Sequence, residues 1–280
     1  MRHNPLVPTQ KRSAAWRIAI AALSPGLLLV LVLAAQVTGS WDVLTIGNAG
    51  GIQFMDLTHV TASAECLRLD PSRNLYSETC DPSGLPYNYP RAWALSLTAL
   101  GVTQASTSLI GTLFTLAFAV SIFVLSLKAM PRGFDLRTLP ALALAVVSPP
   151  VFLLLERGNT DTVIFVLLAV ASLLLISQRR VLGSVILALA ASGKFFSVPS
   201  AIALWNPRQG RPSAMIAFAS VLTLGIVASI RDWPQILQGT PQPIDDAFGA
   251  SVLFLPMWNA LELPHPEIGP RIAGLATFLL

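Results

Sequence analysis

Charged side chains are scarce in this sequence: 11% of its 280 residues are Asp, Glu, Lys or Arg, while 54% are hydrophobic. Soluble domains contain about 25% charged residues, so this composition excludes an ordinary soluble globule, and the apolar content excludes a disordered chain. The 18 basic residues outnumber the 14 acidic ones, but they form no single patch of the kind that binds nucleic acid. They fall in short groups between apolar runs, which is typical of a membrane protein with several spans.

Cysteine is rarer still: the sequence has two, Cys66 and Cys80, and both lie in the one long polar segment, residues 39–91. The sequence shows no fixed-period repeat, no low-complexity tract and no pattern that indicates a metal site or a cofactor. We therefore expect one integral-membrane domain over residues 1–280, with 39–91 as an outer loop. In an oxidising compartment the two cysteines can form a disulfide; two unpaired thiols are the alternative.

Apolar runs long enough to cross a bilayer, about 20 residues, predict an all-α bundle of transmembrane helices. Five runs fit: Ile18–Thr38, Ser108–Leu127, Leu139–Leu155, Asn159–Ser177 and Pro212–Ile230. Lys194 divides a further run into two half-length helices, Val181–Ser192 and Phe195–Trp205. The segment Trp93–Val102 is too short to span and is expected at the interface. We expect six or seven spans, some of them broken.

The distribution of basic residues sets the expected orientation, because short cytoplasmic loops are enriched in Lys and Arg. With the N-terminus in the cytoplasm, 11 of the 18 basic residues and only one of the 14 acidic residues, Asp135, fall on the inner side. This interpretation places the loop 39–91 and the tip at Lys194 on the outer face. It locates the functional surface outside, on a plasma membrane of bacterial type.

Asp56 is the first candidate for chemistry. Phe54, Leu57, Val60 and Leu67 recur at helical spacing and predict an amphipathic helix resting on the membrane. Asp56 falls in its early turns, where the helix dipole favours an ionised carboxylate, and such a carboxylate can act as a general base for a hydroxyl. The alternative is a solvated aspartate at a helix start. One turn further on, His59 is interpreted as a polar interfacial histidine.

The end of the outer loop, Tyr87–Trp93, contains three aromatic residues, Arg91 and several turn formers. Tyr89 and Arg91 can line a site for a sugar or a phosphate, because aromatic faces and guanidinium groups bind such ligands. The alternative is an aromatic belt at the level of the lipid headgroups.

Two further polar groups interrupt apolar segments. Residues 156–161, which include Arg157, Asn159 and Asp161, lie between two predicted spans, just after Pro149-Pro150, which break the preceding helix. Polar groups at such a boundary must pair or face a cavity, so they are either a functional site or a paired helix cap. Lys194 lies at the tip of the half-length helices, where it either snorkels or binds an anion such as a lipid phosphate.

The order of these segments resembles the GT-C superfamily of polytopic glycosyltransferases. The likeness rests on Asp56, on Tyr87-Asn88-Tyr89-Pro90, on Gly158-Asn159-Thr160-Asp161, and on Lys194 with Pro199, and it covers about residues 15–260. The chain is most similar to the polyprenyl-phosphate-mannose-dependent α-mannosyltransferases, glycosyltransferase family 87. It departs from that pattern in having no acidic pair at Asp56 and Arg91 where a second proline is common, which leaves the donor sugar open.

The resemblance implies an all-helical fold with an outward cavity, and a reaction with no cofactor. The donor would be a polyprenyl-phosphate sugar, the acceptor a lipid or a glycan, and the surrounding partners membrane lipids. Asp56 would take the proton from the acceptor hydroxyl, which attacks the anomeric carbon with inversion. Arg157 and Lys194 would neutralise the departing polyprenyl phosphate. Asn159 and Asp161 would position the sugar or an arginine.

Two other interpretations stay open from the sequence. A transporter or flippase would also have charges and broken helices within the membrane, although it gains little from a long outer loop. An inactive or incomplete relative is the other, because the apolar run Arg271–Leu280 stops at about half the thickness of the hydrocarbon core. Because this run is too short to span, we expect a chain that lacks further C-terminal spans.

Overall fold

The structure is a computed structural model that describes residues 9–45, 53–76, 80–82, 84, 86–129, 143–204 and 212–239. The chain divides into two compact units, Met1–Ile236 and Leu237–Leu280. Beyond Gly239 the second unit falls outside the described residues, as does the predicted final run Arg271–Leu280. The fold and the site below belong to the first unit.

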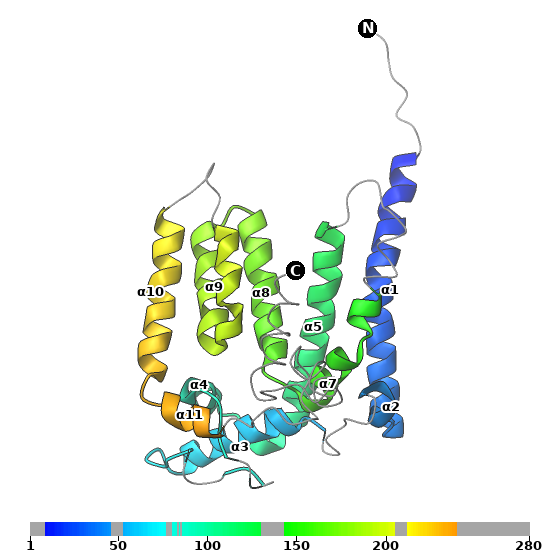
Figure 1. The fold of residues 1–280 in the computed structure, drawn as a ribbon. Coiled ribbons are helices and arrows are strands. Elements are labelled where there is room, and N and C mark those ends of the chain that lie inside the picture. Colours follow the sequence, from blue (N-terminus) through cyan, green and yellow to red (C-terminus); the bar gives the residue numbers. More distant parts are fainter. Residues whose placement is uncertain are drawn as a thin grey trace, which may run out of the picture. The chain divides into compact units, whose positions relative to one another are not determined.

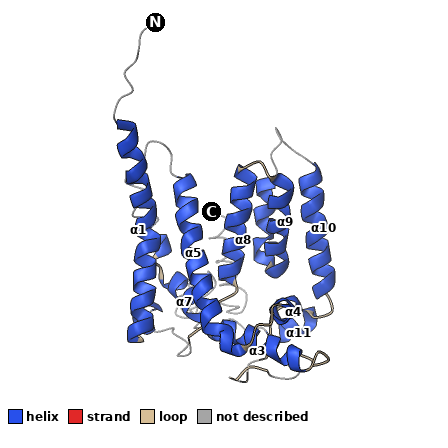
Figure 2. Ribbon diagram, turned by 180° about the vertical axis from the view of Figure 1, so that it is seen from behind, coloured by secondary structure: helices blue, strands red, loops and turns tan. Residues whose placement is uncertain are grey.

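The described residues form an all-α structure without strands (Figure 2). The elements, in chain order, are α1 (Thr9–Thr38), α2 (Trp41–Thr45), α3 (Met55–Leu69), α4 (Arg91–Ala99), η1 (Gln104–Ser106), α5 (Thr107–Ala129), α7 (Pro149–Arg157), α8 (Asp161–Ile176), α9 (Arg180–Gly193), η2 (Phe195–Leu204), α10 (Pro212–Ser229) and α11 (Trp233–Gly239). Within the first unit, α1 packs on α5, α5 on α8, α8 on α9 and α9 on α10 (Figure 1). The shorter helices α3, α4 and α7 lie along the lower edge of this row in Figure 1, at the lower ends of the long helices.

Three described helices are long and apolar enough to cross a membrane: Ala15–Thr38, Gln104–Lys128 and Pro212–Ser229. Large apolar side chains on them stay exposed, among them Val30, Leu113 and Leu224. Helices that are apolar on their exposed sides are suited to lipid and not to water. The chain is therefore a membrane-embedded helix bundle, as its composition predicts.

The expected span at Leu139–Leu155 is not a span by itself in its described part, and Pro149-Pro150 break the helix as predicted. The helices Ala143–Arg157 and Asp161–Ile176 pass as a span only together and are bent by 111°, so the described residues hold three spans, or four if this bent pair counts as one. Ser148 is extended because it precedes proline, and Pro149 starts the new helix α7. The described part of the chain thus holds fewer than the six or seven spans, some of them broken, that the sequence predicts for the whole chain.

Helix α3 is enclosed by protein instead of resting on a surface by one face. Leu57, Val60 and Leu67 are buried as their spacing predicts, but His59, Thr61 and Ser63 are buried as well. The hydroxyl groups of Thr61 and Thr107 lie 2.6 Å apart, and that of Ser63 donates to the His59 carbonyl oxygen. Because the hydroxyl groups of Thr61 and Ser63 are hydrogen-bonded, they can be buried. Helix α3 packs against α4, α5 and α7.

Candidate functional site

The start of α3 is fixed against the junction between α7 and α8. Phe54 caps α3 in the left-handed conformation, and its N–H donates to the carbonyl oxygen of Glu156 at 2.6 Å. A Cβ added to Gly111 would lie 2.7 Å from the Phe54 ring, and one added to Gly158 would lie 3.1 Å from it. The ring therefore needs glycine at both neighbours, and this packing holds Asp56 beside the junction.

Gly158 shapes the junction itself. It ends α7 with a φ of 61°, and an added Cβ would lie 3.0 Å from Cβ of Leu57. Glycine alone meets both the left-handed backbone and the close approach without strain. The turn brings Asn159 and Asp161 to the start of α8, where the Asp161 N–H donates to Oδ1 of Asn159 at 3.0 Å.

A chain of polar contacts joins α3, α8 and the tip of α9. Nδ2 of Asn159 donates to Oδ2 of Asp56 at 2.9 Å, and Nζ of Lys194 donates to Oδ1 of Asn159 at 3.1 Å. The Lys194 ammonium also forms an ion pair with Oδ1 of Asp161 at 2.5 Å. Lys194 directly follows α9 and precedes η2, so the break between these helices supplies the ammonium. We call Asp56, Asn159, Asp161 and Lys194 the polar cluster.

Tyr89 adjoins this cluster. Nζ of Lys194 lies 5.7 Å from the centre of its ring, within the range of a cation–π contact. Burial raises the pKa of the Tyr89 hydroxyl, and the carboxylates of Asp56 and Asp161 raise it further. The hydroxyl consequently remains a donor over the physiological pH range.

Burial also sets the electrostatics of Asp56. Desolvation raises the pKa of this carboxyl above its ordinary 3.8, against the opposing attraction of Arg157 and Lys194 and the hydrogen bond from Asn159. Such a carboxylate is a stronger base than an exposed aspartate, while the surrounding cations still favour its ionised form.

Arg157, the last residue of α7, is a further cation of the site, and its charge attracts the Asp56 carboxylate. Within the described part of the chain its guanidinium makes no hydrogen bond or ion pair, and its Nε is buried without one. Arg157 is half-buried, and a buried N–H such as that of its Nε is stable only with an acceptor or an anion beside it. Its donors are thus available to an anionic ligand near Asp56.

Arg91, a sequence candidate, is not joined to the cluster among the described residues. Its Nη2 donates to the carbonyl oxygen of Pro71 at 3.2 Å, in an exposed position. The expectation that it lines the same site as Tyr89 therefore has no support from its contacts. Its partner lies 20 positions away within the outer loop, which no local pattern indicates.

The reading of His59 as an interfacial residue is wrong. Its side chain is only 7% exposed, and Nδ1 lies 2.8 Å from Oδ2 of Asp81, whose side chain is 1% exposed. Cys80, which directly precedes Asp81, forms a disulfide with Cys66 of α3. Two adjacent residues of the loop are thus attached to α3. The sequence signal was weak: a histidine one turn after Asp56, and an acid beside a cysteine.

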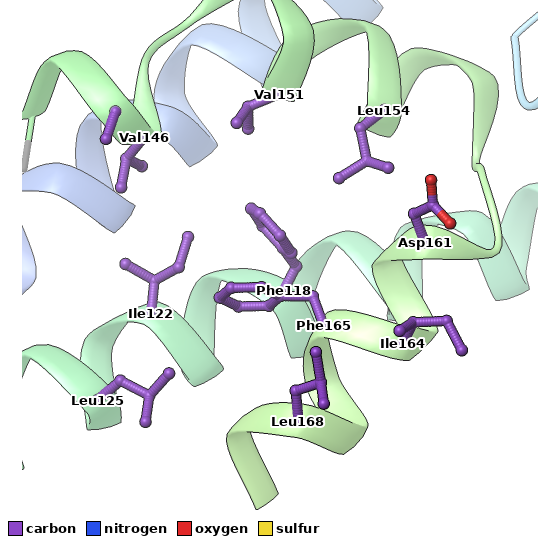
Figure 3. Close-up of a pocket in the computed structure, with 11 residues that line it drawn as sticks. Phe118, Ile122, Leu125, Val146, Val151, Leu154, Asp161, Ile164, Phe165 and Leu168 are labelled. Atoms are coloured by element: carbon purple, nitrogen blue, oxygen red, sulfur yellow. The ribbon is translucent and has the colours of Figure 1, made fainter. Parts of the chain in front are cut away.

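An apolar cavity of about 480 Å³ opens between α5, α7 and α8 (Figure 3). Asp161 is its one charged lining residue and lies at one end, beside Leu154 and Ile164. The other lining residues are apolar: Phe118, Ile122, Leu125, Ala145, Val146, Val151, Phe165 and Leu168. The arrangement can hold an apolar chain whose end meets the polar cluster through Asp161.

Comparisons with protein-family models, with curated proteins and with solved structures give no match to this chain. Among the described residues, no group of three or more His, Cys, Asp or Glu side chains could hold a metal ion. The site therefore offers these groups for chemistry: a half-buried carboxylate, an amide, an ion-paired ammonium and a guanidinium without a hydrogen bond to the described residues.

Proposed function

We propose that the chain is an integral-membrane glycosyltransferase of the GT-C type. It moves a hexose, which we assign as mannose, from a polyprenyl phosphate to a lipid or glycan acceptor on the outer face of a bacterial plasma membrane. The observation that carries the proposal is the contact of Asp56 with Asn159, which links this carboxylate to Lys194 and to Asp161 at the end of the apolar cavity.

Asp56 supplies the base. Its carboxylate takes the proton of the acceptor hydroxyl as that oxygen bonds to the anomeric carbon. The bond between this carbon and the phosphate oxygen breaks, and the polyprenyl phosphate leaves with the electron pair. Attack opposite the leaving group inverts the anomeric centre. The raised pKa of Asp56 supports this role, because a base of moderate strength is more effective at neutral pH.

Arg157 and Lys194 supply positive charge for the leaving phosphate. Arg157 attracts Asp56 but forms no hydrogen bond or ion pair with the described residues, so its donors are the more accessible ones. Lys194 is already paired with Asp161 and held by Asn159, which fixes its position. Fixed cations that meet developing negative charge are an effective source of transition-state stabilisation.

The apolar cavity suits the tail of such a donor. A prenyl chain has no polar groups, and Asp161 is the one charged residue in the lining. Asp161 also forms an ion pair with Lys194, so one end of the cavity adjoins a proposed phosphate-binding cation. The disulfide between Cys66 and Cys80 supports the outer placement of the loop, since disulfides persist in oxidising compartments.

A flippase for a lipid-linked substrate is the second candidate. The 111° bend between α7 and α8 and the short pair α9 and η2 favour it, because transporters build their sites from broken helices. The base at Asp56 has no part in a transport cycle that breaks no bond.

One experiment separates the two functions. Vesicles containing the chain are loaded with polyprenyl-phosphate mannose labelled in the sugar, and the lipids and glycans are then extracted. The proposal expects label in a product that resists the mild acid that cleaves sugar phosphates. Label that crosses the membrane but stays on polyprenyl phosphate would establish the flippase instead.

A further inference from the structure

The imidazole of His59 is held in one orientation by protein groups. Nδ1 lies 2.8 Å from Oδ2 of Asp81, and both side chains are buried. The disulfide between Cys66 and Cys80 holds the segment that bears Asp81 against the helix that bears His59. Because a carboxylate only accepts hydrogen bonds, the proton of the neutral imidazole resides on Nδ1.

The other ring nitrogen, Nε2, has no partner. It is buried and makes no hydrogen bond to any described residue. With the proton on Nδ1, Nε2 carries a lone pair and is an acceptor. Buried acceptors are almost always satisfied in folded proteins, so one that is left open in a side chain fixed from its other edge indicates a ligand.

His59 belongs to the surroundings of the polar cluster. It follows Asp56 by three positions on α3, and residues at this spacing share one face of a helix. The centre of its ring lies 6.1 Å from that of Tyr89, whose ring is 5.7 Å from Nζ of Lys194. Tyr89 is thus a common neighbour of the histidine and of the cluster.

We propose that His59, oriented by Asp81, binds a hydroxyl group of the transferred sugar through Nε2. This inference rests on the proposed function, which assigns the acceptor hydroxyl to Asp56 and leaves His59 for the donor sugar. The pair is a hydroxyl-binding subsite: Asp81 positions the ring, and Nε2 accepts the hydrogen bond. Its ligand carries hydroxyl groups, and a bare polyprenyl phosphate does not satisfy it.

The test observes the imidazole directly by nitrogen NMR. The protein has three histidines, and the variant His3→Gln/His265→Gln leaves His59 as the single imidazole. This variant is labelled with ¹⁵N-histidine, purified in nanodiscs and titrated at neutral pH with polyprenyl-phosphate mannose. Polyprenyl phosphate without a sugar is the matched control. We expect an imidazole protonated on Nδ1 alone, and an Nε2 resonance that shifts with the mannose lipid and not with the control.

A second measurement compares substitutions at the same position by equilibrium binding. His59→Phe is expected to weaken binding of the mannose lipid by about tenfold, the loss of one hydrogen bond, with unchanged binding of polyprenyl phosphate. His59→Gln retains an acceptor and is expected to recover most of the affinity. Equal losses for both lipids would show that His59 only supports the fold.

The outcomes separate this subsite from the proposed function. An imidazole protonated on Nε2, or on both nitrogens, overturns the subsite. So does an unshifted Nε2 in a protein that transfers mannose, a result that leaves the glycosyltransferase intact. A shifted Nε2 without transfer supports the subsite and contradicts the enzyme, and failure of the mannose lipid to bind contradicts both.

Discussion

Asp56 and Asn159 lie 103 positions apart in the sequence, yet the Asn159 amide donates to the Asp56 carboxylate at 2.9 Å. The contact depends on Phe54, which ties the start of α3 to Glu156, and on Gly158, which leaves room for it. The amide oxygen of Asn159 meets Lys194 in turn. One short side chain thus couples the proposed base to the proposed phosphate-binding cation.

The pH dependence of transfer follows from Asp56. The base acts when ionised, and burial raises the pKa of its carboxyl above 3.8. Activity is therefore full at higher pH and falls as pH drops through the raised pKa, earlier than for an exposed aspartate. In Arg157→Gln the strongest opposing attraction is lost, so the pKa rises further and the acid limb moves to higher pH. Rates at saturating donor across pH check this; an acid limb that stays in place would contradict it.

Use of the donor is expected to depend on the two cations unequally. Arg157→Met removes a guanidinium that forms no hydrogen bond or ion pair with the described residues, and the loss of a charged hydrogen bond is worth about tenfold or more in KM for the donor. Lys194→Met has a smaller effect, because the ammonium is shared with Asp161. Arg91→Met is the matched control and is expected to leave KM unchanged, since Arg91 bonds to Pro71. Equal KM values in all three variants would return the cations to a structural role.

The α7–α8 junction is expected to tolerate no side chain at Gly158. Gly158→Ala combines a left-handed backbone, which costs about 1–2 kcal/mol for other residues, with an overlap at Leu57. Gly84→Ala is the control, because Gly84 has a φ of 72° but open space around it. Thermal unfolding in detergent is expected to show a larger loss for Gly158→Ala, together with loss of transfer. Similar losses of thermal stability in the two variants would mean that the overlap with Leu57 does not destabilise the protein.

The outer loop is expected to depend on its disulfide. Cys66 and Cys80 close a loop of sequence separation 14, and such a cross-link stabilises by about 3 kcal/mol through the unfolded state. Reduction, or the variant Cys66→Ala/Cys80→Ala, should lower the stability of the protein by up to this amount and loosen Asp81 from His59. Differential alkylation with and without reductant reports the bond. Thiols that react fully before reduction would contradict it.

The sequence predicts the long helices well and the bent ones poorly. Hydropathy alone locates the apolar spans in α1, α5 and α10 to within a few residues at each end, because their exposed sides are apolar. Lys194 and Gly193 correctly mark the break between α9 and η2. The 111° bend at Gly158 escapes the same reasoning, since a window of apolar residues carries no information about direction.

Local sequence patterns predict only part of the candidate site. Asn159, Asp161 and Lys194 are found because each is polar in an apolar setting, and Asp56 because it lies in the early turns of a predicted helix. The fold brings these four residues together. His59 and Asp81 do not, because their pairing spans 22 positions through a loop that is closed by the disulfide. Arg91 lies in a segment whose composition suits a ligand site. Its guanidinium bonds instead to the carbonyl oxygen of Pro71 in the same loop, which local sequence does not indicate.

The most direct measurement is the rate of mannose transfer from labelled polyprenyl-phosphate mannose by vesicles containing wild type, Asp56→Asn or Asp42→Asn at equal abundance. Asp42 is the matched control, an aspartate in the first turn of α2 that is exposed. We expect that Asp56→Asn inserts normally and loses about 10²–10⁴-fold in rate, the usual effect of removing a general base, while Asp42→Asn keeps the wild-type rate. Wild-type turnover by Asp56→Asn, or no transfer by the wild type with every acceptor lipid and glycan offered, would contradict it.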